Sequence, residues 1–167
     1  MKEVAILLLL AVMINGCGSS TAVESPSGSV WQAVMSGGEG GTPKSGTGFS
    51  FNTQFTVASN GALTISSFQF LNSGSCYGNV GPTPSGTLTV TYNSDDQITG
   101  TFSFNIPSAA GDTITLTSTS ITGTVNPNNY YMLSGVTIVG TWALVPGGSS
   151  SNCVAASGPF TMTQTGT

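Results

Sequence analysis

The chain has 167 residues, of which 38% are hydrophobic and only 5% are charged, and its formal net charge is −4. It contains no His and no Arg, and Lys44 is the only basic residue after Lys2. Neutralising phosphates requires several Lys or Arg side chains, so nucleic acid is excluded as a partner. The regular spacing of the hydrophobic residues favours a folded core over disorder, and the length has room for one domain.

Residues 1–16 are predicted to be a lipoprotein signal peptide. Their apolar run from Val4 to Ile14 is shorter than the roughly 20 residues of a membrane-spanning helix. The segment Ile14-Asn15-Gly16-Cys17 resembles the lipobox of bacterial lipoproteins, in which the Cys becomes the lipidated first residue of the mature chain. The resemblance implies a lipid on Cys17, attachment to the membrane through that lipid and, since residue 18 is not Asp, location in the outer membrane of the cell envelope. The alternative is an ordinary secretory leader with an incidental Cys.

The remainder of the chain divides into a tether and one domain. Residues 17–28 comprise the Cys that is expected to be lipidated and a run of small polar residues without periodicity, which predicts a flexible tether. Residues 29–167 are expected to form a single β-barrel domain, because their hydrophobic residues alternate with a period of two and no segment has helical periodicity.

The clearest strand pattern is the hairpin Gly48–Leu71. In its first arm Phe49, Phe51, Phe55 and Val57 share one parity, and Asn60-Gly61 is predicted to form a two-residue type I′ turn. In its second arm the parity of the hydrophobic residues changes, and a bulge at Ser66-Ser67 would return all of them to one face.

Six further strands are expected, with the long loops Ser36–Gly48, Asn72–Pro84 and Pro146–Ser157 and the short connections Ser94–Gln97 and Asn126–Tyr130 between strands. The strands are Ser29–Ser36, Gly86–Asn93, Ile98–Ile106, Asp112–Val125, Tyr131–Val145 and Gly158–Gln164. The parity changes within Asp112–Val125, so this segment is either two strands joined by a turn or one strand with a bulge.

The cysteines decide the number of strands. Cys76 and Cys153 remain once Cys17 is assigned to lipid, and two cysteines in an exported domain are expected to form a disulfide. Their loops must then lie at the same end of the fold. Eight strands satisfy this condition, whereas nine place the two loops at opposite ends, so Asp112–Val125 is interpreted as one bulged strand.

Consecutive hairpins with short turns predict an all-β fold, an eight-stranded antiparallel up-and-down barrel. The pattern resembles the lipocalin and avidin barrels and, more loosely, a class of uncharacterised bacterial lipoproteins with a Trp near the first strand. Ser29 stands where the G-x-W motif has Gly, so ligand residues are not transferred from those families. A two-sheet β-sandwich is the alternative. A membrane-spanning barrel is less favoured because it would make the lipid anchor redundant.

No catalytic, metal or cofactor site is predicted. A Ser or Cys nucleophile would lack a His base, and Lys44 lies in a Gly-rich loop rather than in a buried setting that lowers the pKa of an amine. Asp95 and Asp96 are interpreted as turn residues, not as a glycosidase pair, because such carboxyls must converge. Calcium binding near Asp95, Asp96 or Asp112 is a weak alternative, since the loop spacing of calcium sites is missing.

Two functions are compatible with this sequence. The first is a non-catalytic envelope protein that binds a partner protein or a glycan through long loops at the end away from the membrane. The second is a carrier of a small apolar ligand inside the barrel, which a cavity of about 300 Å³ open at one end would favour. Tyr77 is expected to be an exposed partner contact in the distal loops, unless it packs against the disulfide, and Tyr130 and Tyr131 are expected at the tether end.

Overall fold

A computed structural model describes residues 29–37, 49–73, 77, 81–92, 98–126, 129–148, 151 and 153–166. These residues contain eight β-strands, in agreement with the predicted count. The strands are β1 (Val30–Met35), β2 (Ser50–Val57), β3 (Leu63–Asn72), β4 (Ser85–Tyr92), β5 (Ile98–Pro107), β6 (Thr113–Asn126), β7 (Asn129–Val145) and β8 (Ala156–Gly166).

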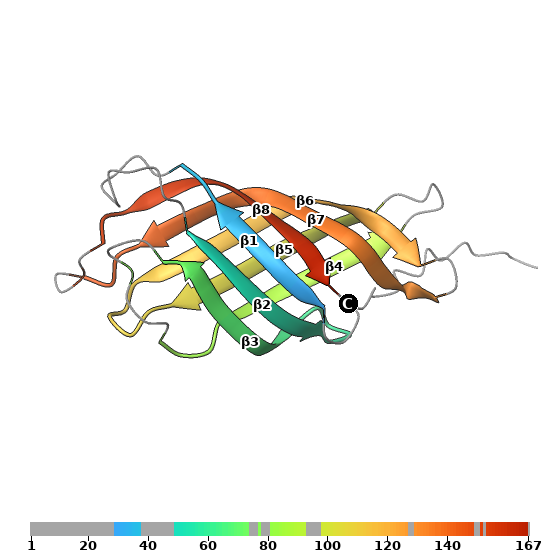
Figure 1. Cartoon of the computed structure of the whole chain (residues 1–167), viewed down its shortest axis with the longest axis horizontal. Helices are drawn as coiled ribbons and strands as arrows, with labels where there is room; N and C mark the ends of the chain where they lie inside the picture. Colours follow the sequence, from blue (N-terminus) through green and yellow to red (C-terminus); the bar gives the residue numbers. More distant parts are fainter. Residues whose placement is uncertain are drawn as a thin grey trace, which may run out of the picture.

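All eight strands belong to one antiparallel sheet in the order β3-β2-β1-β8-β7-β6-β5-β4. Strands that follow one another in the chain are neighbours in the sheet, and the first strand pairs with the last, as the up-and-down barrel predicts (Figure 1). The curled sheet is therefore the predicted barrel and not a two-sheet sandwich. One interruption remains, because β3 and β4 are the two edges of the sheet, and the backbone pairing between them in the described residues is an isolated bridge between Ala62 and Thr87.

Two bulges were predicted from changes in side-chain parity, and both are present. Gln54 of β2 faces Ser67 while Phe55 faces Ile65, so Ser66 is the extra residue of β3. The pairing of β6 with β7 shifts between Thr117 and Ser120, and β6 continues as one strand across this shift. Each bulge lets hydrophobic residues on both sides of it face the core.

The turn between β2 and β3 differs from the prediction. Ser59 and Asn60 occupy its centre, since the Gly61 amide donates to the Ala58 carbonyl at 2.8 Å, and Gly61 follows with a φ of 83°. This is a three-residue loop, and a type I′ turn centred on Asn60-Gly61 is wrong. The Asn60 side chain explains the difference, because its Oδ1 accepts a hydrogen bond from the Ala62 amide at 3.0 Å.

The strand boundaries differ from the predicted ones by one or two residues, most clearly at the starts of β7 and β8. β7 begins at Asn129, two residues earlier than predicted, and Asn129 pairs directly with Asn126 of β6. β8 begins at Ala156 rather than at Gly158. The predicted Ser94–Gln97 turn lies outside the described residues.

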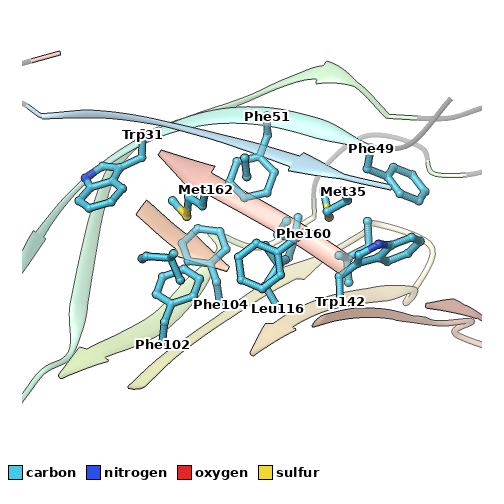
Figure 2. Packing of buried hydrophobic residues seen from close by; sticks show 14 of the residues in the cluster. Trp31, Met35, Phe49, Phe51, Phe102, Phe104, Leu116, Trp142, Phe160 and Met162 are labelled. Carbon is cyan, nitrogen blue, oxygen red and sulfur yellow. The ribbon is translucent and has the colours of Figure 1, made fainter. Parts of the chain in front are cut away.

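Aromatic side chains from opposite walls of the barrel meet in its interior (Figure 2). The rings of Phe102 on β5 and Phe160 on β8 lie 6.1 Å apart, and those of Phe51 on β2 and Phe104 on β5 lie 5.6 Å apart. Each of these four side chains is at most 2% exposed. The inward residues predicted from parity thus form one packed core, and bulky rings fill the space between the walls.

The outer face of the barrel is polar but uncharged. Asp112 is the only Asp, Glu, Lys or Arg among the described residues, and it is buried. Threonine and serine residues of neighbouring strands are paired with one another across the sheet. One such row runs from Thr87 of β4 through Ser103 and Thr117 to Thr141 of β7. The outside therefore offers hydroxyl groups and a few exposed valines to its surroundings.

Candidate functional site

The connections that precede the even-numbered strands lie at one end of the barrel. Neighbouring strands run in opposite directions, so the β1–β2, β3–β4, β5–β6 and β7–β8 connections share the end toward which the odd-numbered strands point (Figure 1). This end is called the distal end below. It carries all three long loops of the prediction, and it is the candidate functional site.

The Asp112 carboxylate holds the distal end together. Its Oδ1 accepts a hydrogen bond from the Gly147 amide at 2.9 Å, and its Oδ2 accepts one from the Ser108 hydroxyl at 3.2 Å. The Ser151 side chain also lies close enough to this carboxylate to lower its pKa. A side chain only 1% exposed thus receives hydrogen bonds from the β5–β6 turn and from the β7–β8 loop. Such buried charges are stable only when they are satisfied in this way.

These donors hold the pKa of Asp112 below its usual value. The Ser151 side chain has the largest effect, the Gly147 amide follows, and burial opposes both because it disfavours the charged form. The carboxylate is therefore ionised at neutral pH and engaged in structural hydrogen bonds. It is a brace between loops rather than a group available for proton transfer.

A close approach of two backbones makes the bond to Gly147 possible. A Cβ on Gly147 would lie 2.3 Å from the carbonyl carbon of Gly111, in the turn just before Asp112. Gly111 itself has a φ of 88°, which favours glycine. Two glycines in adjacent connections therefore let the Gly147 amide reach the carboxylate.

Tyr77 is buried, and the prediction of an exposed partner contact is wrong. Its side chain is 3% exposed and lies against the rings of Phe49 and Phe70, with centroids 5.8 and 5.6 Å away. Its hydroxyl donates to the Ile106 carbonyl and lies 3.5 Å from the carbonyl oxygen of Asp112. Burial, with a smaller contribution from the charge of Asp112, raises the pKa of Tyr77 to about 12. Enclosed in this way, the ring closes the distal end of the core and offers no surface to a partner.

The β7–β8 loop joins the same network through Ser151. The hydroxyl of Ser151, which lowers the pKa of Asp112, accepts a hydrogen bond from the Cys153 amide at 2.9 Å. Cys153 is 7% exposed and packs with the hydrophobic core. The segments beside Cys76 and Cys153 thus both reach Asp112, one through Tyr77 and the other through Ser151.

Several predicted residues lie outside the described part of the chain: Cys17, Lys44, Cys76, Asp95 and Asp96. Tyr130 and Tyr131 belong to β7, near its start at the end opposite the distal loops. Among the described residues, no three His, Cys, Asp or Glu side chains gather as metal ligands would. In the same residues no helix is both long enough and apolar enough to cross a membrane.

The roles of Ser108 and Ser151 were not predicted from the sequence. Asp112 was expected there only as a weak alternative calcium ligand. Serines are too common in this chain for two of them to stand out. Asp112 itself was the available signal. It is the only charged residue from Ile98 to the end of the sequence, and a single charged residue next to buried strands usually has hydrogen-bond partners.

Comparisons with protein-family models, with curated proteins and with solved structures found no match to this chain.

Proposed function

We propose that this protein is a non-catalytic, lipid-anchored protein of the cell envelope that binds a partner protein or a glycan through its distal loops. In this proposal residues 1–16 direct export, and a lipid on Cys17 attaches the chain to the membrane, most simply the outer membrane. The tether of residues 17–28 then places the β2–β3, β4–β5 and β6–β7 connections near the membrane and the distal end away from it.

The packed interior is the observation that carries this proposal. Phe102 and Phe160, on β5 and β8, lie 6.1 Å apart across the barrel, so rings occupy the space that a carried ligand would need. A carrier of a small apolar ligand is therefore the less favoured function. An apolar interior with a hydroxyl-rich exterior is also the reverse of the arrangement in membrane-spanning barrels.

Among the described residues two grooves reach the volume that would suggest a ligand, one on the outside of the sheet and one at the side of the barrel. One, of about 340 Å³, is lined by residues of β6 and β7 around Thr117, Val139 and Thr141. The other, of about 310 Å³, lies between β3 and the segment before β4. The Phe68 ring lines part of the second groove, but neither groove is a cavity that opens at one end of the barrel, so they do not support a barrel carrier.

The brace at Asp112 supports the assignment of the binding role to the distal end. Binding residues are commonly found on loops that a rigid scaffold positions, because loops that are already ordered lose less entropy on binding. Tyr77, Ser108, Gly147 and Ser151 connect three distal connections to one carboxylate or to its main chain. A disulfide between Cys76 and Cys153, which we also propose, would add a covalent link between two of these loops.

Site-specific cross-linking on intact cells tests the orientation and the binding role together. A photoreactive amino acid at Val154, which is 51% exposed in the β7–β8 loop, is expected to form adducts with an envelope protein or glycan. The matched position is the exposed Asn60, in the β2–β3 turn at the opposite end. The same adducts from both positions, or adducts from Asn60 alone, would show that the distal end is not the binding end.

A further inference from the structure

The seam between β3 and β4 is where the barrel's ladder of hydrogen bonds stops. β3 pairs with β2 on one side, and β4 pairs with β5. Between the two edges, the described residues form only the Ala62–Thr87 bridge and a hydrogen bond of 2.8 Å from the Leu88 amide to the Gly61 carbonyl. The stretch of β3 after this bridge, residues 64–71, therefore has no ladder partner on its seam side.

Two prolines explain why the ladder stops. The Leu88 amide points toward the β2–β3 turn, whereas the Gly81 amide donates to the Pro107 carbonyl at the end of β5. Amide directions alternate along β4, so position 84, just before its first residue, shares the direction of Leu88 and faces β3, while residue 82 lies in a bend next to it. Both positions are proline, which has no N–H group to donate. The segment opposite β3 thus cannot extend the ladder beyond the bridge.

A groove of about 310 Å³ occupies this part of the seam. It is lined by Ile65, Ser66, Ser67 and Phe68 of β3 and by Gly81, Thr83 and Pro84 on the other side. The ring of Phe68 is packed against Phe51 and Phe104, with centroids 4.9 and 6.3 Å away. The groove therefore combines a strand edge with an aromatic floor that is held in place by the core.

The charge of the seam indicates what would fit it. None of the lining residues is charged, and Asp112, the only charged residue in the described part of the chain, is engaged by Gly147 and Ser108. A charged side chain placed in the groove would lose water without gaining an opposite charge. Edge strands are commonly protected from pairing by charged residues or prolines, and β3 has neither.

From these observations we propose that the free edge of β3 binds an extended, uncharged peptide strand of a partner protein by strand addition. The main chain of the peptide pairs with residues 64–71, and its alternate side chains point toward Phe68 and Ile65. Pro82 and Pro84 keep the protein's own chain from occupying that edge. The site lies along the side of the barrel, although residues 81–84 belong to the β3–β4 connection, and its test does not depend on what the other distal loops bind.

Hydrogen exchange of the purified full-length protein tests the proposal directly. The probe is a synthetic peptide with the sequence of β4, SGTLTVTY, because β4 contains Thr87, which forms the bridge to Ala62 just before β3. At a peptide concentration ten times its Kd, exchange in residues 64–71 is expected to slow about tenfold, while exchange in β6 stays unchanged. The control peptide has proline in place of the first two threonines and is expected to have no effect. Unchanged exchange in β3 at saturating concentrations of the first peptide would overturn the proposal.

A proline variant tests the cause of the open seam. Pro82→Thr with Pro84→Thr restores the two missing amides in the segment opposite β3, so exchange in residues 64–71 is expected to slow without peptide, and the response to the peptide is expected to disappear. Pro159→Thr, at an exposed position of β8, is the matched control and should behave as the wild type. A double variant with wild-type exchange and wild-type peptide binding contradicts the role of the prolines. If the double variant does not fold, the peptide experiment on the wild type decides.

A second copy of the chain is the competing occupant. If exchange in residues 64–71 slows as the protein concentration rises, without peptide, the edge pairs with another copy and the proposed partner peptide is wrong. Exchange that is independent of protein concentration supports the proposal.

Discussion

The Asp112 carboxylate and the Gly147 amide, 35 residues apart in the chain, are joined by a hydrogen bond of 2.9 Å. This bond ties the start of β6 to the segment that follows β7. Because Asp112 is also the only charged residue in the described part of the chain, it is the carboxyl group of that part whose ionisation can change the stability.

Asp112→Asn is expected to lower the free energy of unfolding by about 2 kcal/mol. The amide that replaces the carboxylate keeps one acceptor oxygen, but it turns charge-assisted hydrogen bonds into neutral ones and places an NH₂ group against one of the donors. Urea denaturation measures the change. Thr101→Val, at an exposed position of β5, is the control and should change the free energy by less than about 0.5 kcal/mol. Equal stability of Asp112→Asn and wild type would show that the brace is unimportant.

Stability is also expected to fall in acid. The pKa of Asp112 is lowered in the folded state, so its contribution is complete above the unfolded-state pKa of about 4 and is lost as the pH falls toward the lower folded-state value. Denaturation between pH 7 and pH 2 measures this loss. The Asp112→Asn variant should show a flatter profile below about pH 4. An unchanged profile would assign the acid sensitivity to other carboxyl groups.

The strand pattern was predictable because it depends on local alternation. The parity change in the second arm of the hairpin gave the bulge at Ser66, and the change within β6 gave one strand rather than two. The brace at the distal end was not predictable, because it depends on which loops meet in space. The open seam required both kinds of information, since the effect of Pro82 and Pro84 depends on which amides face β3.

Phe104→Ala is expected to destabilise the fold by about 4 kcal/mol and to create a cavity. The Phe104 ring is fully buried and contacts the rings of Phe51, Phe68 and Phe102. Benzene is expected to bind to this variant, because apolar cavities in a packed core accept such ligands, and not to the wild type. NMR titration with benzene distinguishes the two. Binding to the core of the wild-type protein would favour the carrier function over the proposed one.

Cys76 and Cys153 are expected to form a disulfide, since Tyr77 and Ser151 bring their two loops to the same Asp112 residue. Closing this long loop stabilises the protein by about 4 kcal/mol in the chain-entropy account. Peptide mapping under non-reducing conditions identifies the pair. Cys76→Ala and Cys153→Ala should each lower the stability to a similar extent, and their combination should cost little more. Two free thiols in the native protein would contradict the pairing.

The final prediction concerns attachment to the membrane. The leader of residues 1–16 has an apolar run too short to hold the chain in a bilayer, so the attachment is expected to depend on the lipid at Cys17. Cys17→Ser in a Gram-negative host should therefore abolish incorporation of labelled fatty acid and prevent cleavage before residue 17. Ser20→Ala, in the tether, is the matched control and should be lipidated and membrane-bound like the wild type. Fractionation of the cells separates two outcomes for Cys17→Ser. Loss of the label together with release from the outer membrane supports the lipid anchor, whereas normal processing and unchanged membrane attachment would show that Cys17 is incidental and that the leader is an ordinary secretory one.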